Sequence, residues 1–384
     1  MEVYFDNSAT TRIYDEVLEL MINVQRDHYG NPSARHLKGG DAEKIVKTAK
    51  EQVANTLKVK PTEIFFTSGG TEGNNMAIIG RSYAITGKKG HIITTRIEHA
   101  SVYNPVLFLE SQGFEVSFLP VDNTGKADLN ALKEMLRPDT VLVSMMMVNN
   151  EMGAIEPIEE AAKIVHENAK RALFHVDAIQ AYGKLKILPK KMGIDILTVS
   201  GHKIHGPKGT GFIYIRENAG LKPIIYGGGQ QNDMRSGTEN VAGIAGLGLA
   251  AEISNKTLAE RVEHMYEIRE YMMGRLGEIE EAVINSTPGK AGAPQIISCS
   301  FEGVKAEPLL HALEDKGIYV SSGSACSSNH PAISGTLKAI GVRDDLLDCT
   351  IRFSFNQYNT KEEVDYCIEA LKELIPTLKR YTRR

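Results

Sequence analysis

The chain has 384 residues, of which 42% are hydrophobic and 24% charged, and its formal net charge at pH 7 is −4. These values predict a globular protein of about two domains, and they give no reason to expect nucleic acid or an anionic membrane as a partner. No apolar run approaches membrane-spanning length, Met1–Asp6 lacks the order of a signal peptide, and the four cysteines have no metal-binding or disulfide spacing, so we expect a cytoplasmic protein without a metal.

The middle of the chain alternates between strand-like and helix-like segments. Short apolar runs precede helical patterns repeatedly, and this alternation predicts an α/β fold in which crossover helices surround a mostly parallel sheet. The expected strands are 64–67, 91–95, 116–121, 140–148, 172–177, 195–200 and 209–216. The expected helices between them are 74–86, 101–112, 128–136 and 157–169.

A glycine-rich turn follows the first of these strands. The segment Thr67-Ser-Gly-Gly-Thr71-Glu-Gly-Asn-Asn75 lies between a strand and a helix. Its glycines allow an anion to approach the backbone closely, and the helix that follows offers free N–H groups to a phosphate. The segment matches neither a Walker A loop nor the G-x-G-x-x-G pattern. A plain glycine turn with a threonine cap is the alternative interpretation.

His99 follows the next strand, in Glu98-His-Ala-Ser101. An imidazole at the edge of the sheet has the chemistry to stack on an aromatic cofactor and to transfer protons. The alternative is a solvent-exposed histidine at the start of a helix.

Two later strands end in chemically capable groups. The run from Ala172 ends at Asp177, with Gln180 three residues later, and the run from Asp195 ends in Ser200-Gly-His-Lys203. Because α/β sheets bind ligands beyond the carboxyl ends of their strands, one pocket can receive both Asp177 and Lys203. An amine that forms a Schiff base and a carboxylate that keeps a ring nitrogen protonated suit pyridoxal phosphate. The alternatives are a lysine in a solvated loop and an aspartate that caps a helix.

The last third of the chain has a different pattern. A glycine-rich stretch at 226–230 leads to a Gly/Ala-rich helix from about residue 240, and a helical run over 257–284 is expected to bridge two domains. A smaller α+β unit follows. Its expected strands are 295–301, 318–321 and 350–355, and its expected helices are 306–315, 331–340 and 360–378.

The four cysteines have different surroundings. Cys299 alternates with apolar residues of a strand and Cys367 lies on an apolar helix stripe, so we expect these two to belong to the core, while Cys349 leads into an apolar strand. Cys326 lies among serines, glycine and alanine in 321–331. We expect that segment to be an exposed, mobile loop with an accessible thiol. The alternative is an incidental surface cysteine.

The chain resembles the NifS-type cysteine desulfurases of the class V aminotransferase group, which are pyridoxal-phosphate enzymes of fold type I. The resemblance covers nearly the whole chain and is carried by Tyr4–Thr10, by Ser-Gly-His-Lys at Lys203 and by Ser-Ser-Gly-Ser-Ala-Cys at Cys326. It implies a large cofactor-binding domain of residues 14–256. It also implies a small α+β domain of residues 1–13 and 257–384 that carries the cysteine loop.

The resemblance implies roles for the polar residues of the predicted site. Lys203 would bind the aldehyde of pyridoxal 5'-phosphate, Asp177 its ring nitrogen and Gln180 its phenolic oxygen. His99 would stack on the ring and act in catalysis with Lys203 and Cys326. The residues implied to bind phosphate are Gly70, Thr71, Ser200 and His202, together with Thr238, which would reach the phosphate of a partner subunit.

The resemblance also implies the substrate and the reaction. Asn150 and Arg352 would hold the carboxylate of L-cysteine, a task that suits the planar fork of arginine. A homodimer would convert cysteine to alanine and pass the sulfur, as a persulfide on Cys326, to an acceptor or iron–sulfur scaffold protein. The alternatives are a selenocysteine lyase, an aminotransferase, and a catalytically idle sulfur carrier.

Overall fold

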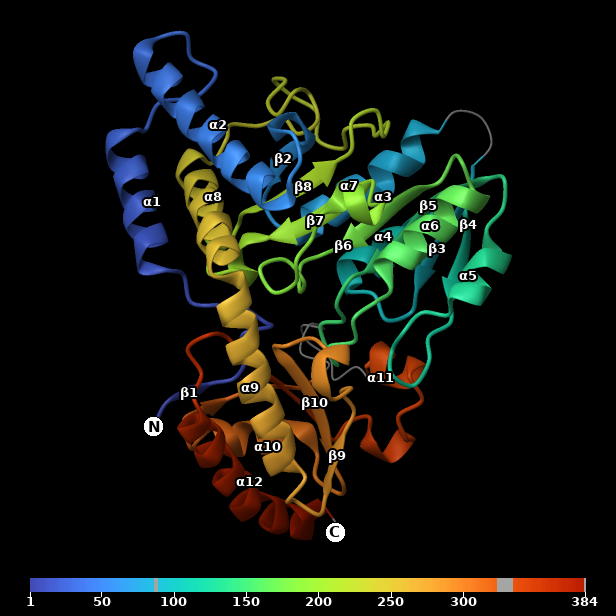
Figure 1. The fold of residues 1–384 in the computed structure, drawn as a ribbon, viewed down its shortest axis with the longest axis vertical. Helices are drawn as coiled ribbons and strands as arrows, with labels where there is room; N and C mark the ends of the chain where they lie inside the picture. The colour runs from blue at the N-terminus through green and yellow to red at the C-terminus, as the bar shows by residue number, and fades with distance from the viewer. Residues whose placement is uncertain (86–88, 323–333, 383–384) are drawn as a thin grey trace.

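The computed structural model describes residues 1–85, 89–322 and 334–382. Its upper half in Figure 1 is built on a seven-stranded sheet in the order β2-β8-β7-β6-β5-β3-β4, in which every pair is parallel except the two made by β8. This confirms the predicted α/β fold. The strands are β2 (Ile64–Thr67), β3 (His91–Thr95), β4 (Glu115–Leu119), β5 (Thr140–Met146), β6 (Leu173–Asp177), β7 (Ile196–Ser200) and β8 (Gly211–Ile215).

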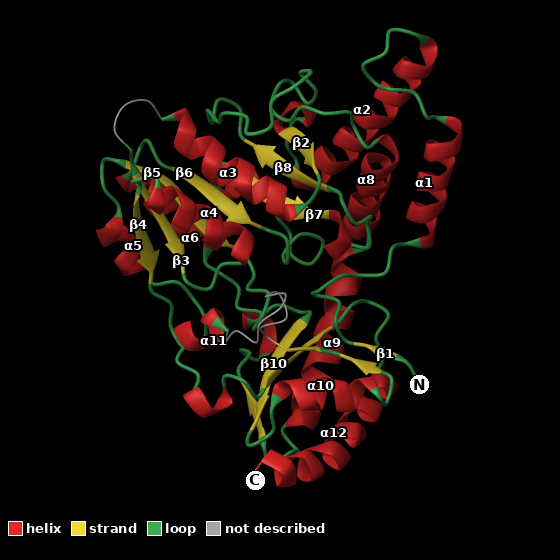
Figure 2. Ribbon diagram, turned by 180° about the vertical axis from the view of Figure 1, so that it is seen from behind, coloured by secondary structure: helices red, strands yellow, loops and turns green. Residues whose placement is uncertain are grey.

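Both faces of this sheet are covered, which explains why its strands are apolar throughout. Successive residues point to opposite faces: Ile92 packs into one buried cluster and Ile93 into another. Figures 1 and 2 view the sheet from its two sides, with α6 in front in the first and α3 in front in the second. The crossover helices are α3 (Gly70–Ala84), α4 (Ala100–Ser111), α5 (Leu129–Met135), α6 (Ile158–Asn168) and the short α7 (Pro189–Met192).

Two N-terminal helices that the sequence analysis did not predict pack against the Gly/Ala-rich helix. They are α1 (Asp15–Asp27) and α2 (Leu37–Leu57), and their common neighbour is α8 (Val241–Lys256). The glycines of α8 allow this close approach. A Cβ on Gly246 would lie 2.8 Å from the Met21 side chain, and one on Gly248 would lie 2.8 Å from the Cα of Ala49.

The lower half of the molecule contains an antiparallel sheet in the order β12-β13-β10-β9 and its own apolar core. The first residues of the chain belong spatially to this half, because β1 (Val3–Tyr4) pairs with β11 (Ile318–Tyr319). The strands of the sheet are β9 (Ala282–Ile284), β10 (Ile296–Phe301), β12 (Ser321–Ser322) and β13 (Thr350–Ser354). The helices are α9 (Leu258–Leu276), α10 (Ala306–Glu314), α11 (Gly335–Ala339) and α12 (Lys361–Thr382).

Three predicted segments differ from the structure. The helix expected over 257–284 ends at Leu276, and residues 282–284 instead form β9 beside β10. The helix expected from residue 74 begins at Gly70, so the glycine turn is already its first turn. The segment 318–321 contributes to two short strands, β11 and β12, in different sheets.

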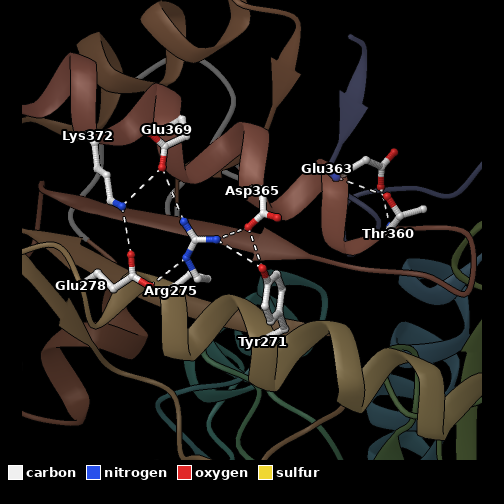
Figure 3. A network of polar contacts seen from close by, with 8 residues as sticks. All are labelled: Tyr271, Arg275, Glu278, Thr360, Glu363, Asp365, Glu369 and Lys372. Carbon is white, nitrogen blue, oxygen red and sulfur yellow. Dashed lines mark hydrogen bonds and ion pairs between the residues drawn. The ribbon is translucent and has the colours of Figure 1, made fainter.

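Polar contacts connect α12 to α9, the helix that continues from α8 into the lower half (Figures 1 and 3). Arg275 pairs with Glu278, just beyond the end of its own helix, and with Asp365 and Glu369 on α12. Lys372 pairs with Glu278 at 2.9 Å. Isolated surface ion pairs contribute little to stability, but a shared network fixes the relative position of two helices more firmly.

No helix within the described ranges is both long and apolar enough to span a membrane.

Candidate active site

The parallel register of β6 and β7 brings their polar ends together. Asp177 lies opposite Thr198, so the carboxylate that ends β6 and the turn that follows β7 occupy the same edge of the sheet. A cavity of about 180 Å³ opens there. Arg352 on β13 of the lower sheet completes its wall, so the cavity lies between the two halves of the molecule.

Most of the residues predicted for the site line this cavity. Thr238 is exposed. Within the described residues, it lines neither this cavity nor a second hollow that adjoins it at the start of α3. Cys326 lies outside the described residues. The predicted residues that line the cavity are Gly70, Thr71, His99, Asn150, Asp177, Gln180, Ser200, His202, Lys203 and Arg352.

Lys203 is directed into the molecule rather than into a solvated loop. Its Nζ donates hydrogen bonds to the main-chain oxygens of Ser8 (2.5 Å) and Ala9 (2.7 Å). These carbonyls belong to the segment Tyr4–Thr10, which therefore forms part of the site. Both acceptors are neutral carbonyls, so neither of these two contacts neutralises the amine as an ion pair would.

Asp177 is buried and held from two sides. Its Oδ1 accepts a hydrogen bond from the Ile179 N–H at 2.9 Å, and its Oδ2 accepts one from Asn74 Nδ2 at 2.8 Å. Burial raises the pKa of Asp177, and these hydrogen bonds and the charges of His99 and Lys203 oppose that rise. A cationic N–H placed beside the carboxylate would favour its ionised form, as the protonated ring nitrogen of pyridoxal phosphate does.

His99 lies at the start of a helix, but it is half-buried rather than exposed to solvent. It is the N-cap residue of α4, and its ring also lines the cavity. Its Nδ1 accepts a hydrogen bond from the Ser101 N–H at 3.1 Å and lies 2.8 Å from the Ser101 hydroxyl.

A second hollow adjoins the cavity at the start of α3. Four of the predicted phosphate-binding residues, Gly70, Thr71, Ser200 and His202, line both, and Lys208 adds a cation. A Cβ on Gly70 would lie 2.2 Å from the Cδ1 of Ile179, so only glycine allows Ile179 to pack this closely against the start of α3. Burial and the nearby lysines lower the pKa of His202 to about 4, which leaves it neutral near pH 7. The first-turn N–H groups of α3 and the Lys208 ammonium suit an anion.

Arg352 is buried, and only some of its guanidinium donors form hydrogen bonds. Its Nη1 donates to the Asn150 carbonyl at 2.8 Å, and its Nη2 donates to Asp6 Oδ1 at 2.9 Å. Its Nε has no hydrogen-bond partner in the described part of the chain. A buried donor without a partner is costly, so a substrate carboxylate that accepts from this guanidinium would remove the cost.

The three described cysteines are buried, as predicted for Cys299 and Cys367. Cys299 and Cys367 are fully buried, and Cys349 is 2% exposed. Burial raises the pKa of Cys299 and Cys367, and it raises that of Cys349 to about 11. Their thiols therefore stay protonated near pH 7 and are poor nucleophiles.

Ser8, Asn74 and Ser101 belong to this region although they were not predicted from the sequence. Ser8 and Ser101 line the cavity, and Asn74 binds Asp177 beneath it. A signal for Asn74 was present: it follows Gly70 by four residues, so the two share a face of α3. No such local signal identifies Ser8, because its position depends on contacts with residues far away in the chain.

A lysine and a buried carboxylate at the ends of neighbouring strands, beside an anion-binding turn, are typical of pyridoxal-phosphate enzymes. The chain belongs to the aminotransferase class-V family, whose sequence pattern matches residues 3–367. Similar proteins within this family have names that state a more specific activity. A protein named cysteine desulfurase IscS from Dictyoglomus turgidum is 42% identical over 98% of this chain and 95% of its own length. The cysteine desulfurase IscS of Methanosarcina thermophila is 40% identical over 98% and 93%.

Solved structures agree with this assignment. A NifS-like protein superposes with a TM-score of 0.93 at 40% identity, covering 98% of this chain and all of that one. The structure described as SspA in complex with cysteine superposes with a TM-score of 0.81 at 35% identity, covering 94% of this chain and all of its own.

Proposed function

We propose that the protein is a cysteine desulfurase, which uses pyridoxal phosphate to convert L-cysteine to L-alanine and retains the sulfur as a persulfide. The observation that carries the proposal is the shared cavity of Lys203, Asp177 and Arg352. An amine and a carboxylate suit the cofactor, and an arginine with an unused donor suits the carboxylate of an amino acid. Family membership agrees with this chemistry.

The residues present fit pyridoxal phosphate. Lys203 would hold the aldehyde carbon, Asp177 the ring nitrogen and Gln180 the phenolic oxygen, with His99 over the ring. The cofactor, when bound, supplies a cationic ring that stabilises negative charge at the substrate Cα. The proposed phosphate contacts are Gly70, Thr71, Ser200, His202 and, from the partner subunit, Thr238.

Three residues would carry the remaining chemistry. Arg352, with Asn150, would orient the substrate by its carboxylate, so that its Cα hydrogen faces the Lys203 amine. That amine would remove the proton once the substrate's own amine has displaced it from the aldehyde carbon. The Cys326 thiolate would then attack the sulfur of the substrate, so that an S–S bond forms and the C–S bond breaks. The electron pair of the broken bond stays on the carbon side, which becomes alanine after protonation.

The larger organisation belongs to the same proposal. Residues 14–256 would form a cofactor-binding domain, and residues 1–13 with 257–384 would form a small domain that carries Cys326. The position of Thr238 on the surface suits a homodimer in which it serves the partner's site. The acceptor of the persulfide sulfur would be a scaffold for iron–sulfur clusters or another sulfur carrier of the cytoplasm.

Arg352 should determine the affinity for cysteine. Replacing it with lysine keeps the charge but loses the planar fork, and replacing it with alanine loses both. We expect Arg352→Lys to weaken cysteine binding about tenfold and Arg352→Ala to weaken it further, the size of effect typical of charged hydrogen bonds. Titration of the cofactor spectrum with L-cysteine measures this affinity.

Arg343→Ala is the matched control for Arg352. Arg343 is exposed and pairs with Glu302 and Asp345 away from the cavity, so its loss should leave cysteine affinity unchanged. The resting cofactor spectrum should be the same in all these variants. Unaltered affinity in Arg352→Ala would remove the proposed role.

The activity itself is tested with purified protein loaded with pyridoxal phosphate. We expect a yellow protein that releases alanine from L-cysteine without any keto acid, and sulfide when a reductant is present. Turnover that requires a keto acid would identify an aminotransferase, and turnover of selenocysteine but not cysteine would identify a selenocysteine lyase. A protein that stays colourless with added cofactor would contradict the proposal and favour a sulfur carrier.

A further inference from the structure

We propose that Asn74 and Ser101 are positioning residues that hold His99 as a neutral imidazole with its hydrogen on Nε2. His99 would then act toward the cavity as a hydrogen-bond donor and not as a proton acceptor. The inference deepens the proposed function, on which it rests for the placement of His99 beside the cofactor. The geometry that carries it is a continuous chain of hydrogen bonds from His99 to Asp177.

The contact with Ser101 determines which nitrogen of His99 carries the hydrogen. The main-chain N–H of Ser101 can only donate, and it points to Nδ1 at 3.1 Å. Nδ1 must therefore offer its lone pair, so the hydrogen of the neutral ring lies on Nε2. The Ser101 hydroxyl, 2.8 Å from Nδ1, must then also donate to it.

Asn74 determines the direction in which the Ser101 hydroxyl points. Its Nδ2 lies 2.9 Å from the Ser101 Oγ and 2.8 Å from Asp177 Oδ2, and Asn74 is fully buried. A carboxylate only accepts, so the amide nitrogen must face Asp177, and its second hydrogen goes to the Ser101 oxygen. The hydroxyl hydrogen is then directed to His99. This arrangement has an energetic cost, because the buried Asn74 Oδ1 has no hydrogen-bond partner among the described residues.

The start of α4 disfavours the protonated ring as well. His99 is the N-cap of this 12-residue helix, whose positive end repels a cation. An imidazolium would also place an Nδ1 hydrogen against the Ser101 N–H. Triosephosphate isomerase uses a histidine in this way, since a helix start keeps the imidazole neutral while it polarises the ligand.

Other charges near His99 act in both directions. Asp177 and Glu151 favour its protonation, since each interacts electrostatically with the ring. Lys203 and Arg352 line the same cavity and oppose it. Glu98 precedes His99 in the chain, and burial raises its pKa well above the ordinary value, which disfavours its charged form. These charges therefore act in opposite directions on the protonation of His99, whereas both Ser101 donors act directly on Nδ1.

The test is the ¹⁵N spectrum of histidine side chains in the cofactor-loaded protein without cysteine, with His99 identified by its loss in His99→Gln. We expect the Nε2–H form of the neutral ring across the range from about pH 6 to pH 8. Ser101→Ala and Asn74→Leu should each keep the Nε2–H form, because the Ser101 main-chain N–H remains, but should raise the titration midpoint by roughly one pH unit, since each removes or weakens the hydroxyl donor to Nδ1.

Ser111→Ala is the matched control, because Ser111 ends the same helix and its side-chain hydrogen bonds in the described part of the chain are with its neighbours Phe108 and Gln112. It should leave the His99 signals unchanged. A wild-type ring with hydrogen on Nδ1, or one that is protonated at pH 7, would overturn the proposal. The proposal would also be overturned if Ser101→Ala and Asn74→Leu gave the same His99 signals as Ser111→Ala. Ser101→Ala is the smaller change, and it provides the test even if Asn74→Leu does not fold. Because no cysteine is present, the result is independent of whether the protein desulfurates it.

Discussion

Replacing Lys203 with alanine should lower turnover by about a thousandfold or more, because the variant loses both the covalent attachment of the cofactor and the base that removes the Cα proton. Borohydride reduction of the wild-type protein, followed by peptide mass spectrometry, should find the cofactor on Lys203. The Ala variant should bind pyridoxal phosphate without a reducible link. Its absorption should then resemble that of the free aldehyde.

Two other lysines make this experiment specific. Lys208 lines the adjoining hollow, and Lys184 is buried and donates to the Lys203 carbonyl at 2.8 Å. Burial lowers the pKa of Lys184 to about 7, so it is also a candidate nucleophile. A reduced adduct on either residue would contradict the assignment. Lys186→Ala, at an exposed position outside the cavity, is the control and should keep the wild-type spectrum and activity.

Replacing Cys326 with alanine should abolish desulfuration while leaving the cofactor site intact. We expect the variant to keep its colour and to change its spectrum when cysteine binds, yet to form almost no alanine, because no thiolate is available to accept the sulfur. Spectral titration and alanine measurement on the same sample separate the two steps.

The other three cysteines provide the matched control for Cys326. Replacing Cys299, Cys349 and Cys367 with alanine removes buried side chains, so the triple variant should lose stability. Its desulfuration per folded molecule should remain, because none of these thiols ionises readily near pH 7. Loss of activity in the triple variant with an intact cofactor spectrum would contradict the assignment of the sulfur to Cys326.

The central sheet and the strand ends could be predicted because their signals are local. An apolar run that ends in Asp177 and another that leads to Lys203 are visible in the sequence, and parallel strands align their carboxyl ends. The glycine turn at Gly70 is equally local. The burial of Cys299 and Cys367 followed from strand alternation and helix periodicity, and the structure confirms it.

The remaining features depend on contacts between distant parts of the chain. Lys203 is held by the carbonyls of Ser8 and Ala9, almost two hundred residues earlier, and no local pattern predicts that approach. The partial use of the Arg352 fork depends on Asp6 in the same way. The strand at 282–284 was predicted as helix because its edge position beside β10 is set by tertiary pairing, which overrides local preference.

One experiment tests the central claim most directly: a single turnover of the cofactor-loaded protein with L-cysteine in the absence of reductant, followed by alanine measurement and peptide mapping. The proposed function predicts a persulfide on Cys326 in an amount equal to the alanine formed. Sulfur found on Cys299, Cys349 or Cys367 with Cys326 unmodified, or cysteine consumed without alanine, would contradict it.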